Sequence, residues 1–174
     1  MAIEHGVIKQ IAYVVDDLDA TIARWVEIVG AGPFFRIDNA QVQDMRYRGH
    51  GAEATMSLAV GNSGGVQIEL IQLMDGAPSV YRELPRGVHH LALLAREFEA
   101  ESARLERLGH PVAWALTLPG ICRVHYHDTL ATFGHFIELW ESTEVFRGFL
   151  EMIEAAARDW DGREPMRRLA LSSR

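Results

Sequence analysis

The sequence is poor in cysteine, in long apolar runs and in positive charge. Cys122 is the sole cysteine of the 174 residues, which excludes an intrachain disulfide and a metal site built from several thiolates. No apolar run approaches the roughly 18 residues that a membrane helix needs. The first residues, MAIEHGVIKQ, lack the basic and apolar segments of a signal peptide. We therefore expect a cytoplasmic protein with no membrane partner.

The charge balance is acidic, with a formal net charge of −7 at pH 7. Nucleic acids and anionic membranes are bound by clustered lysine and arginine, so we expect no nucleic-acid partner. Hydrophobic residues make up 48% of the chain. That share and the length suit one compact domain or two small fused modules.

One order of secondary structure is written twice along the chain. The first copy has a strand pattern in VIKQIAYVV, a helix pattern in DDLDATIARWVEIVG that Asp17 or Asp19 can cap, and strand patterns over 34–48, 54–61 and 65–73. The second copy has GVHHLALLA, the helix pattern REFEAESARLERLG, and then VAWALTL, ICRVHYHD and FGHFIELWE. Strand, helix and three strands, repeated, predict two similar modules.

The predicted module boundaries follow from this repeat. We place the first module at 7–75, a linker with two prolines at 76–86, the second module at 87–141, and a C-terminal helix and tail at 142–174. Ser142 is the candidate cap of that last helix.

Both copies end on a glutamate inside an apolar strand, in VQIELIQ and HFIELWE. A buried carboxylate is costly unless a partner offsets its desolvation. Strand side chains alternate between faces, so Glu69 and Glu138 point away from their Ile and Leu neighbours. Gln10 in the first strand of copy one and His90 in the first strand of copy two share that face.

Gln10, Glu69, His90 and Glu138 thus combine one amide oxygen, two carboxylates and one imidazole. This mixture of donors suits a divalent metal with open water positions, and a bound cation would neutralise the two glutamates. We predict one divalent ion, whose identity among Zn, Ni, Co, Mn and Mg is open. Taken one by one, each of the four residues is more typical of a solvated or core side chain than of a metal ligand, and it is the shared phase and the repeat that favour the metal site.

The stretches QIAYVVDDLDATIARWVEIVGAGPF, GVHHLALL and GHFIELWE resemble the vicinal oxygen chelate superfamily of glyoxalase I, methylmalonyl-CoA epimerase, extradiol dioxygenases and bleomycin resistance proteins. The resemblance covers about residues 7–141 and favours the glyoxalase I and epimerase-like branch. It implies an α+β fold of two tandem βαβββ modules that form a U-shaped mixed sheet around a metal-binding cleft, here followed by a C-terminal helix. It also implies that Gln10, Glu69, His90 and Glu138 are the metal ligands, and that the protein is a homodimer.

The resemblance implies a metal-dependent isomerase, epimerase or glyoxalase-like lyase that moves a proton on carbon next to a metal-chelated carbonyl. Glu138 or Glu69 would be the catalytic base. The substrate would be a small carbonyl compound or thioester. Glutathione-binding positions of glyoxalase I are occupied here by Val14 and Leu73, and Arg86 alone matches. Two alternatives stay open: a non-catalytic binding protein of the bleomycin-resistance type, and an extradiol dioxygenase.

Further polar and aromatic residues could bind the substrate. Arg86 or Arg123 could meet an anionic group, and Trp114, Tyr126 and His127 could line the pocket. His127 also forms a His-x-His pair with His125, which could bind metal but is more typical of a hydrogen-bonded pair near Asp128.

Overall fold

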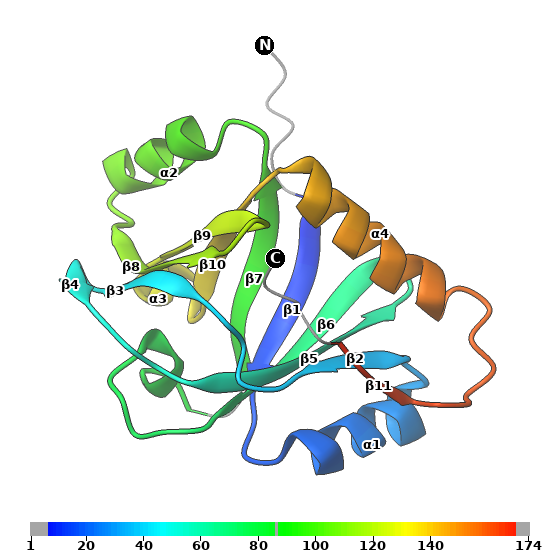
Figure 1. Ribbon diagram of the computed structural model, residues 1–174. Helices are drawn as coiled ribbons and strands as arrows, with labels where there is room; N and C mark the ends of the chain where they lie inside the picture. The colour runs from blue at the N-terminus through cyan, green and yellow to red at the C-terminus, as the bar shows by residue number, and fades with distance from the viewer. Residues whose placement is uncertain (1–6, 86, 170–174) are drawn as a thin grey trace.

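The computed structural model describes residues 7–85 and 87–169 (Figure 1). The elements of the first half are β1 (Ile8–Val14), α1 (Leu18–Val29), β2 (Phe34–Ile37), β3 (Gln43–Tyr47), β4 (His50–Gly51), β5 (Met56–Ser63) and β6 (Val66–Leu73). The elements that follow are the 3₁₀ turn η1 (Val80–Arg82), β7 (Gly87–Ala95), α2 (Phe98–Arg107), β8 (Val112–Leu118), β9 (Cys122–His127), α3 (Leu130–Phe133), β10 (Phe136–Glu141), α4 (Glu144–Ala157) and β11 (Met166–Arg168).

All the strands belong to one mixed sheet in the order β11-β2-β5-β6-β1-β7-β10-β9-β8-β3-β4. The first strands of the two halves, β1 and β7, pair antiparallel in the middle of the sheet. Each has the last strand of its own half as a parallel neighbour, β6 beside β1 and β10 beside β7. Figure 1 shows β1 and β7 side by side, with the remaining strands curving away on either side. The expected α+β fold of two βαβββ modules is confirmed, whereas the exact module boundaries stay predictions.

Helix α1 follows directly from its local sequence. Asp17 caps it, because its side chain accepts a hydrogen bond from the Ala20 N–H at 2.9 Å. Gly30 ends it in the left-handed conformation, with φ 73°. Leu18 and Ile22 are buried against the outer face of β1 and β6. Since this face of β1 meets the helix, the opposite face, which carries Gln10, looks into the molecule.

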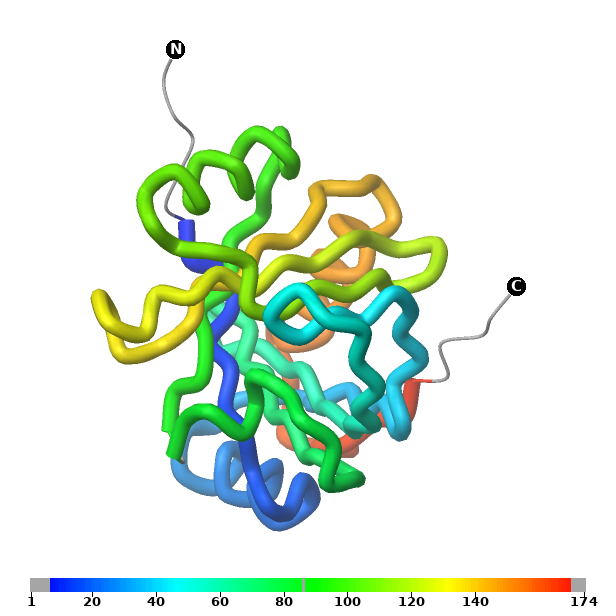
Figure 2. The backbone as a smooth tube through the Cα atoms, turned by 90° about the vertical axis from the view of Figure 1, so that its left-hand side faces the viewer, coloured from blue at the N-terminus to red at the C-terminus, as the bar shows by residue number. Residues whose placement is uncertain are grey.

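The segment 34–48 forms two strands at distant places in the sheet instead of one. Its first part, β2, pairs with β5, while β3 crosses to the other half and pairs with β8. Figure 2 shows the β3–β4 segment in cyan beside the β8–β9 hairpin in yellow-green. A chain that crosses between halves in this way helps to close the concave side of the sheet.

The C-terminal helix α4 begins one residue later than the sequence suggests. Thr143, not Ser142, is its cap, because the Thr143 hydroxyl accepts a hydrogen bond from the Phe146 N–H at 3.0 Å. Ile153 is fully buried and packs with Phe35 and Val60. Helix α4 therefore lies against the first half of the sheet, on its concave side.

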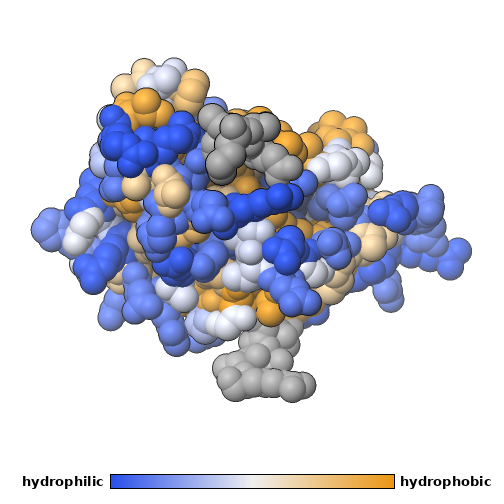
Figure 3. All heavy atoms as spheres, turned by 90° about the horizontal axis from the view of Figure 1, so that it is seen from above, coloured by the Kyte–Doolittle hydropathy of each residue, from blue (hydrophilic) through white to orange (hydrophobic). Residues whose placement is uncertain are grey.

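Polar side chains cover most of the face seen in Figure 3, with hydrophobic residues gathered in small groups. Within 7–85 and 87–169, no helix combines the length and apolar character that crossing a membrane requires.

Candidate metal centre

The four predicted ligands lie on the four central strands, β1, β6, β7 and β10, and come together within one chain. The strand register explains this. Ala12 stands opposite both Glu69 and His90, and Ala92 stands opposite both Gln10 and Glu138. Directly opposed residues point to the same face of a sheet. Both alanines are fully buried, and their small side chains leave room above them for the four larger ones.

Nε2 of His90 is the point on which the other three side chains converge. Its distances are 3.3 Å to Gln10 Oε1, 3.3 Å to Glu69 Oε2 and 3.1 Å to Glu138 Oε2. His90 is fully buried, and Gln10 and Glu138 are 2% and 4% exposed. We call Gln10, Glu69, His90 and Glu138 the ligand cluster.

The hydrogen bonds of His89 determine which ring nitrogen of His90 carries the proton. His89 Nε2 lies 3.1 Å from the Val80 carbonyl oxygen, which can only accept, so Nε2 carries the proton. Burial, and the neighbouring His90, lower the pKa of His89 to about 3, so His89 is neutral and its Nδ1 accepts. His90 Nδ1, 2.9 Å away, must then be the donor. The lone pair of a neutral His90 is thereby placed on Nε2.

Gln67 orients Gln10 in a similar way. The Gln10 amide nitrogen donates to Gln67 Oε1 at 2.7 Å, which turns Gln10 Oε1 towards His90. The ligand cluster therefore presents one nitrogen and three oxygens, all of which are hydrogen-bond acceptors. A hydrogen-bond donor such as water, a proton or a metal ion can satisfy such a set, but of these the proton and the metal ion also offset the charge of the two carboxylates.

The pKa shifts of His90 and Glu69 also bear on whether the ligand cluster favours a positive charge. Burial opposes charge on His90, yet the Glu138 and Glu69 carboxylates outweigh it and raise the pKa of His90 to about 9. Burial also raises the pKa of Glu69 above its ordinary value. Even so, the buried Glu138 Oε2 has no hydrogen-bond partner of good geometry, despite its 3.1 Å separation from His90 Nε2. An unsatisfied buried carboxylate oxygen is what a cation site would use.

The spacing of the ligand cluster is compatible with a shared ion. Ligand atoms at about 2.1 Å from one ion lie about 3 Å apart when they are neighbours in an octahedron. The described residues hold no preformed cage of three or more His, Cys, Asp or Glu side chains. The cluster instead lies close around His90 Nε2, with the glutamine oxygen as its fourth member.

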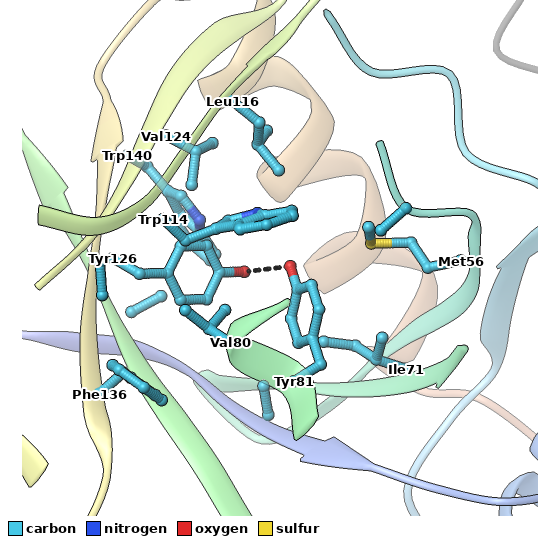
Figure 4. Close-up of a cluster of buried hydrophobic side chains, with 14 of the residues drawn as sticks. Met56, Ile71, Val80, Tyr81, Trp114, Leu116, Val124, Tyr126, Phe136 and Trp140 are labelled. Carbon is cyan, nitrogen blue, oxygen red and sulfur yellow. Dashed lines mark hydrogen bonds between the residues drawn. The ribbon is translucent and has the colours of Figure 1, made fainter. Parts of the chain in front are cut away.

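A cavity opens directly above the ligand cluster. It encloses about 770 Å³ of empty space, including its open mouth. Figure 4 shows the hydroxyls of Tyr81 and Tyr126 directed at each other beside this space, 3.1 Å apart. Burial raises the pKa of both hydroxyls well above the ordinary value, so both remain protonated.

Of the four described residues among the predicted substrate-binding side chains, Tyr126 lines the cavity, whereas Trp114, Arg123 and His127 do not. Trp114 is fully buried in the core next to Tyr81 and does not line the cavity. Arg123 and His127 alternate with Tyr126 along β9 and point to the outer face, where α2 lies. Arg123 pairs with Glu141 at 2.8 Å, and His127 contacts Ser102 at 3.1 Å. Arg86 lies outside the described residues.

Sequence reasoning overlooked three residues of the site: Gln67, His89 and Tyr81. Gln67 is two positions before Glu69 in the same strand, so strand alternation could have placed it on the ligand face. His89 precedes His90 and would be expected to point away, yet its ring reaches the second nitrogen of His90. Tyr81 comes from the linker turn η1, and no periodic pattern marks it.

Comparison with known protein structures supports the fold. The chain is similar in structure to methylmalonyl-CoA epimerase from Mycobacterium tuberculosis, with a TM-score of 0.54, 18% identity, and coverage of 81% of this chain and 91% of the epimerase. It is also similar to a hypothetical protein from Bacillus halodurans, with a TM-score of 0.53, 14% identity, and coverage of 79% and 95%. At these identities the likeness shows the fold alone.

Curated protein sequences contain no match to this chain. The sequence model of the Glyoxalase/Bleomycin resistance protein/Dioxygenase superfamily, however, matches residues 9–126, which is well over half of the chain. The chain therefore belongs to the Glyoxalase/Bleomycin resistance protein/Dioxygenase superfamily.

Proposed function

We propose that the protein is a metal-dependent isomerase, epimerase or glyoxalase-like lyase that moves a proton on carbon next to a carbonyl group. Its substrate would be a small carbonyl compound or thioester. The observation that carries this proposal is the convergence of four acceptor atoms at the floor of a cavity, where three oxygens surround His90 Nε2. The homodimer and the cytoplasmic location expected from the sequence stay predictions.

Gln10, Glu69, His90 and Glu138 would hold the ion. A divalent ion bound there, Zn, Ni, Co, Mn or Mg, would act as a Lewis acid that stabilises negative charge on the substrate oxygen. The described residues supply the other functions. Glu138, whose side chain lines the cavity, would take the proton on its carboxylate, with Glu69 as the alternative base. The apolar walls would keep water away from the reacting carbon.

The tyrosine pair would bind the same oxygen from the other side. Two hydroxyls share one hydrogen bond between Tyr81 and Tyr126, so one of their two protons is left to donate. A neutral donor that faces a developing oxyanion contributes to catalysis without adding charge to the ground state.

A non-catalytic binding protein is the second candidate, and the apolar character of the cavity favours it. An extradiol dioxygenase fits less well, because such enzymes coordinate iron through two histidines and one carboxylate. The ligand cluster has one histidine. His125 and His127 lie on the other face of the sheet, where both contact the Ser102 hydroxyl.

Deuterium incorporation from D₂O tests the proposal. Metal-loaded protein would be incubated with 2-hydroxyacetophenone and with the thioester S-ethyl phenylthioacetate, and loss of the α-proton signal followed by NMR. We expect exchange with wild type and a loss of about 10²–10⁴-fold with Glu138→Gln, which removes a carboxylate of the ligand cluster together with the proposed base. Glu141→Gln, three residues along β10 and outside the cavity, is the matched control and should match wild type. Metal-loaded wild type that exchanges no α-proton would favour the binding protein.

A further inference from the structure

The cavity above the ligand cluster has a sharply divided lining. Its polar groups gather at one end, around the ligand cluster. They come from three members of that cluster and from Gln67 and the two tyrosines, while the fully buried His90 lies beneath them. The remaining wall is hydrocarbon from three sources. Met56 and Ile71 belong to the first half, Leu116, Val124 and Trp140 to the second, and Phe149 to helix α4. Figure 4 shows the first five of these surrounding the tyrosine pair.

No lysine or arginine side chain lines this cavity within the described part of the chain. Arg48 pairs with Glu83 and Asp128, and Arg123 with Glu141 and Glu99, all outside the lining. The charged groups at the cavity are the carboxylates of Glu69 and Glu138. A divalent ion would neutralise these two, and the described residues of the lining would then offer no charge to balance an anionic group on the ligand.

An anionic group placed among these walls would lose its hydration without gaining a partner, which is strongly unfavourable. A neutral hydrocarbon body would instead gain from the removal of its apolar surface from water. The leftover tyrosine proton supplies one neutral hydrogen bond for a ligand oxygen at the polar end. Charge, surface and hydrogen bonding thus all select the same type of molecule.

We infer that the cavity takes an uncharged, largely hydrocarbon molecule whose oxygen-bearing end lies at the ligand cluster and the tyrosine pair. This inference rests on the proposed function and narrows its substrate class. The hydrocarbon body of the molecule points towards α4 and Phe149. Substrates that carry a free carboxylate or phosphate within the cavity, including acyl thioesters of dicarboxylic acids, are disfavoured.

A matched pair of ligands tests this class. 4-Methylcatechol and 3,4-dihydroxybenzoate share the same two adjacent ring hydroxyls. The first compound has a methyl group where the second has a carboxylate. Each would be titrated by calorimetry, under argon, into zinc-loaded wild type whose metal content has been measured. We expect 4-methylcatechol to bind at least about tenfold more tightly, because the carboxylate has no partner in the walls. Equal affinities, or tighter binding of the carboxylate, would overturn the inference and leave the metal site intact.

A charge introduced into the wall provides a second arm. Val42 lines the cavity and is half-buried, so a lysine there could reach solvent and fold. Val42→Lys should reduce or reverse the preference for 4-methylcatechol, and Val42→Gln, of similar polarity but neutral, should keep it. An unchanged preference in Val42→Lys would contradict a selection based on charge.

The failure of the proposed function is distinguishable from the failure of this inference. If none of Zn, Ni, Co, Mn and Mg binds, the proposed function fails, and the same two compounds are titrated into the metal-free protein. A retained preference for 4-methylcatechol there supports the cavity assignment. Binding of neither compound, or of both equally, overturns it.

Discussion

His89 shows how one residue beside the ligand cluster controls its chemistry. Its hydrogen bonds to Val80 and His90 leave the His90 lone pair on Nε2. Replacing it with a residue that cannot accept would free His90 to adopt the other tautomer. Mutation of a residue that orients a metal ligand through a hydrogen bond typically weakens metal binding by 10–100-fold.

We therefore expect His89→Phe to weaken metal binding by about 10–100-fold, measured by competition with a chelator of known affinity. The matched control is His125→Phe, which removes a histidine from the outer face, where it contacts Ser102 at 2.9 Å. Metal affinity of the control should equal that of wild type. Equal affinities for both variants and wild type would show that His89 does not orient His90.

Cys122 provides a test of burial that is independent of the metal. The thiol is 4% exposed, and burial, together with the nearby Glu138 and Glu141, raises its pKa to about 12. A thiol is reactive as the thiolate, so at pH 8 only about one molecule in 10⁴ is in the reactive form. Raising the pH increases that fraction. We expect no reaction with Ellman's reagent at pH 8 in native protein and a full reaction in guanidinium; rapid native labelling would contradict the burial of Cys122.

At the scale of elements, α4 depends on a cap one residue away from the one that the sequence suggests. Thr143 accepts from Phe146 N–H and donates to the Ile121 carbonyl at 2.6 Å. Thr143→Ala should lower the free energy of unfolding by about 1–2 kcal/mol, measured by urea denaturation. Ser142→Ala, which removes a hydroxyl that receives only an exposed hydrogen bond from Arg147, should change it by less than about 0.5 kcal/mol. The reverse order would place the cap at Ser142.

Elements defined by local patterns could be predicted from the sequence, and elements defined by distant partners could not. Helix α1 has its cap, its apolar stripe and its terminating glycine within one short stretch. The segment 34–48 has a strand-like pattern throughout, yet Asn39 and Asp44 adopt positive φ angles of 47° and 53° and break it. The partner of β3 is β8, about 70 residues away in the chain. Nothing local specifies that pairing.

The ligand cluster was predictable because strand alternation is a local signal and the internal repeat can be read directly from the sequence. Gln10, Glu69, His90 and Glu138 come together as the phase of their strands indicates. The wider pocket was not predictable in the same way. Arg123 and His127 were assigned to it from residue type, but their phase along β9 is opposite to that of Tyr126 and carries them to the outer face.

At the scale of the whole molecule, the site lies at the junction of two similar halves. Each half contributes one residue from its first strand and one from its last, around the pair Ala12 and Ala92. One chain therefore supplies the complete ligand cluster. A site assembled from two chains would instead take two of its four ligands from each chain.

Because one chain supplies all four ligands, mixing two variants that each lack one ligand should not restore the site. Glu69→Gln and Glu138→Gln alter different halves of one site. If they are unfolded together and refolded, the mixture should bind no more metal than the two variants do separately, as measured by metal analysis after gel filtration. Recovery of metal binding in the mixture would show that sites form between chains.

The most direct measurement is metal analysis of wild type beside His90→Ala, Glu138→Gln and the control Glu141→Gln, each purified without added metal and then equilibrated with Ni, Co, Zn or Mn. We predict about one ion per chain for wild type and Glu141→Gln, and loss of that ion from the other two, because each removes a ligand around which the cluster is built. Wild type that stays metal-free with all four ions, or cluster variants that keep the ion, would contradict the metal centre proposed for Gln10, Glu69, His90 and Glu138.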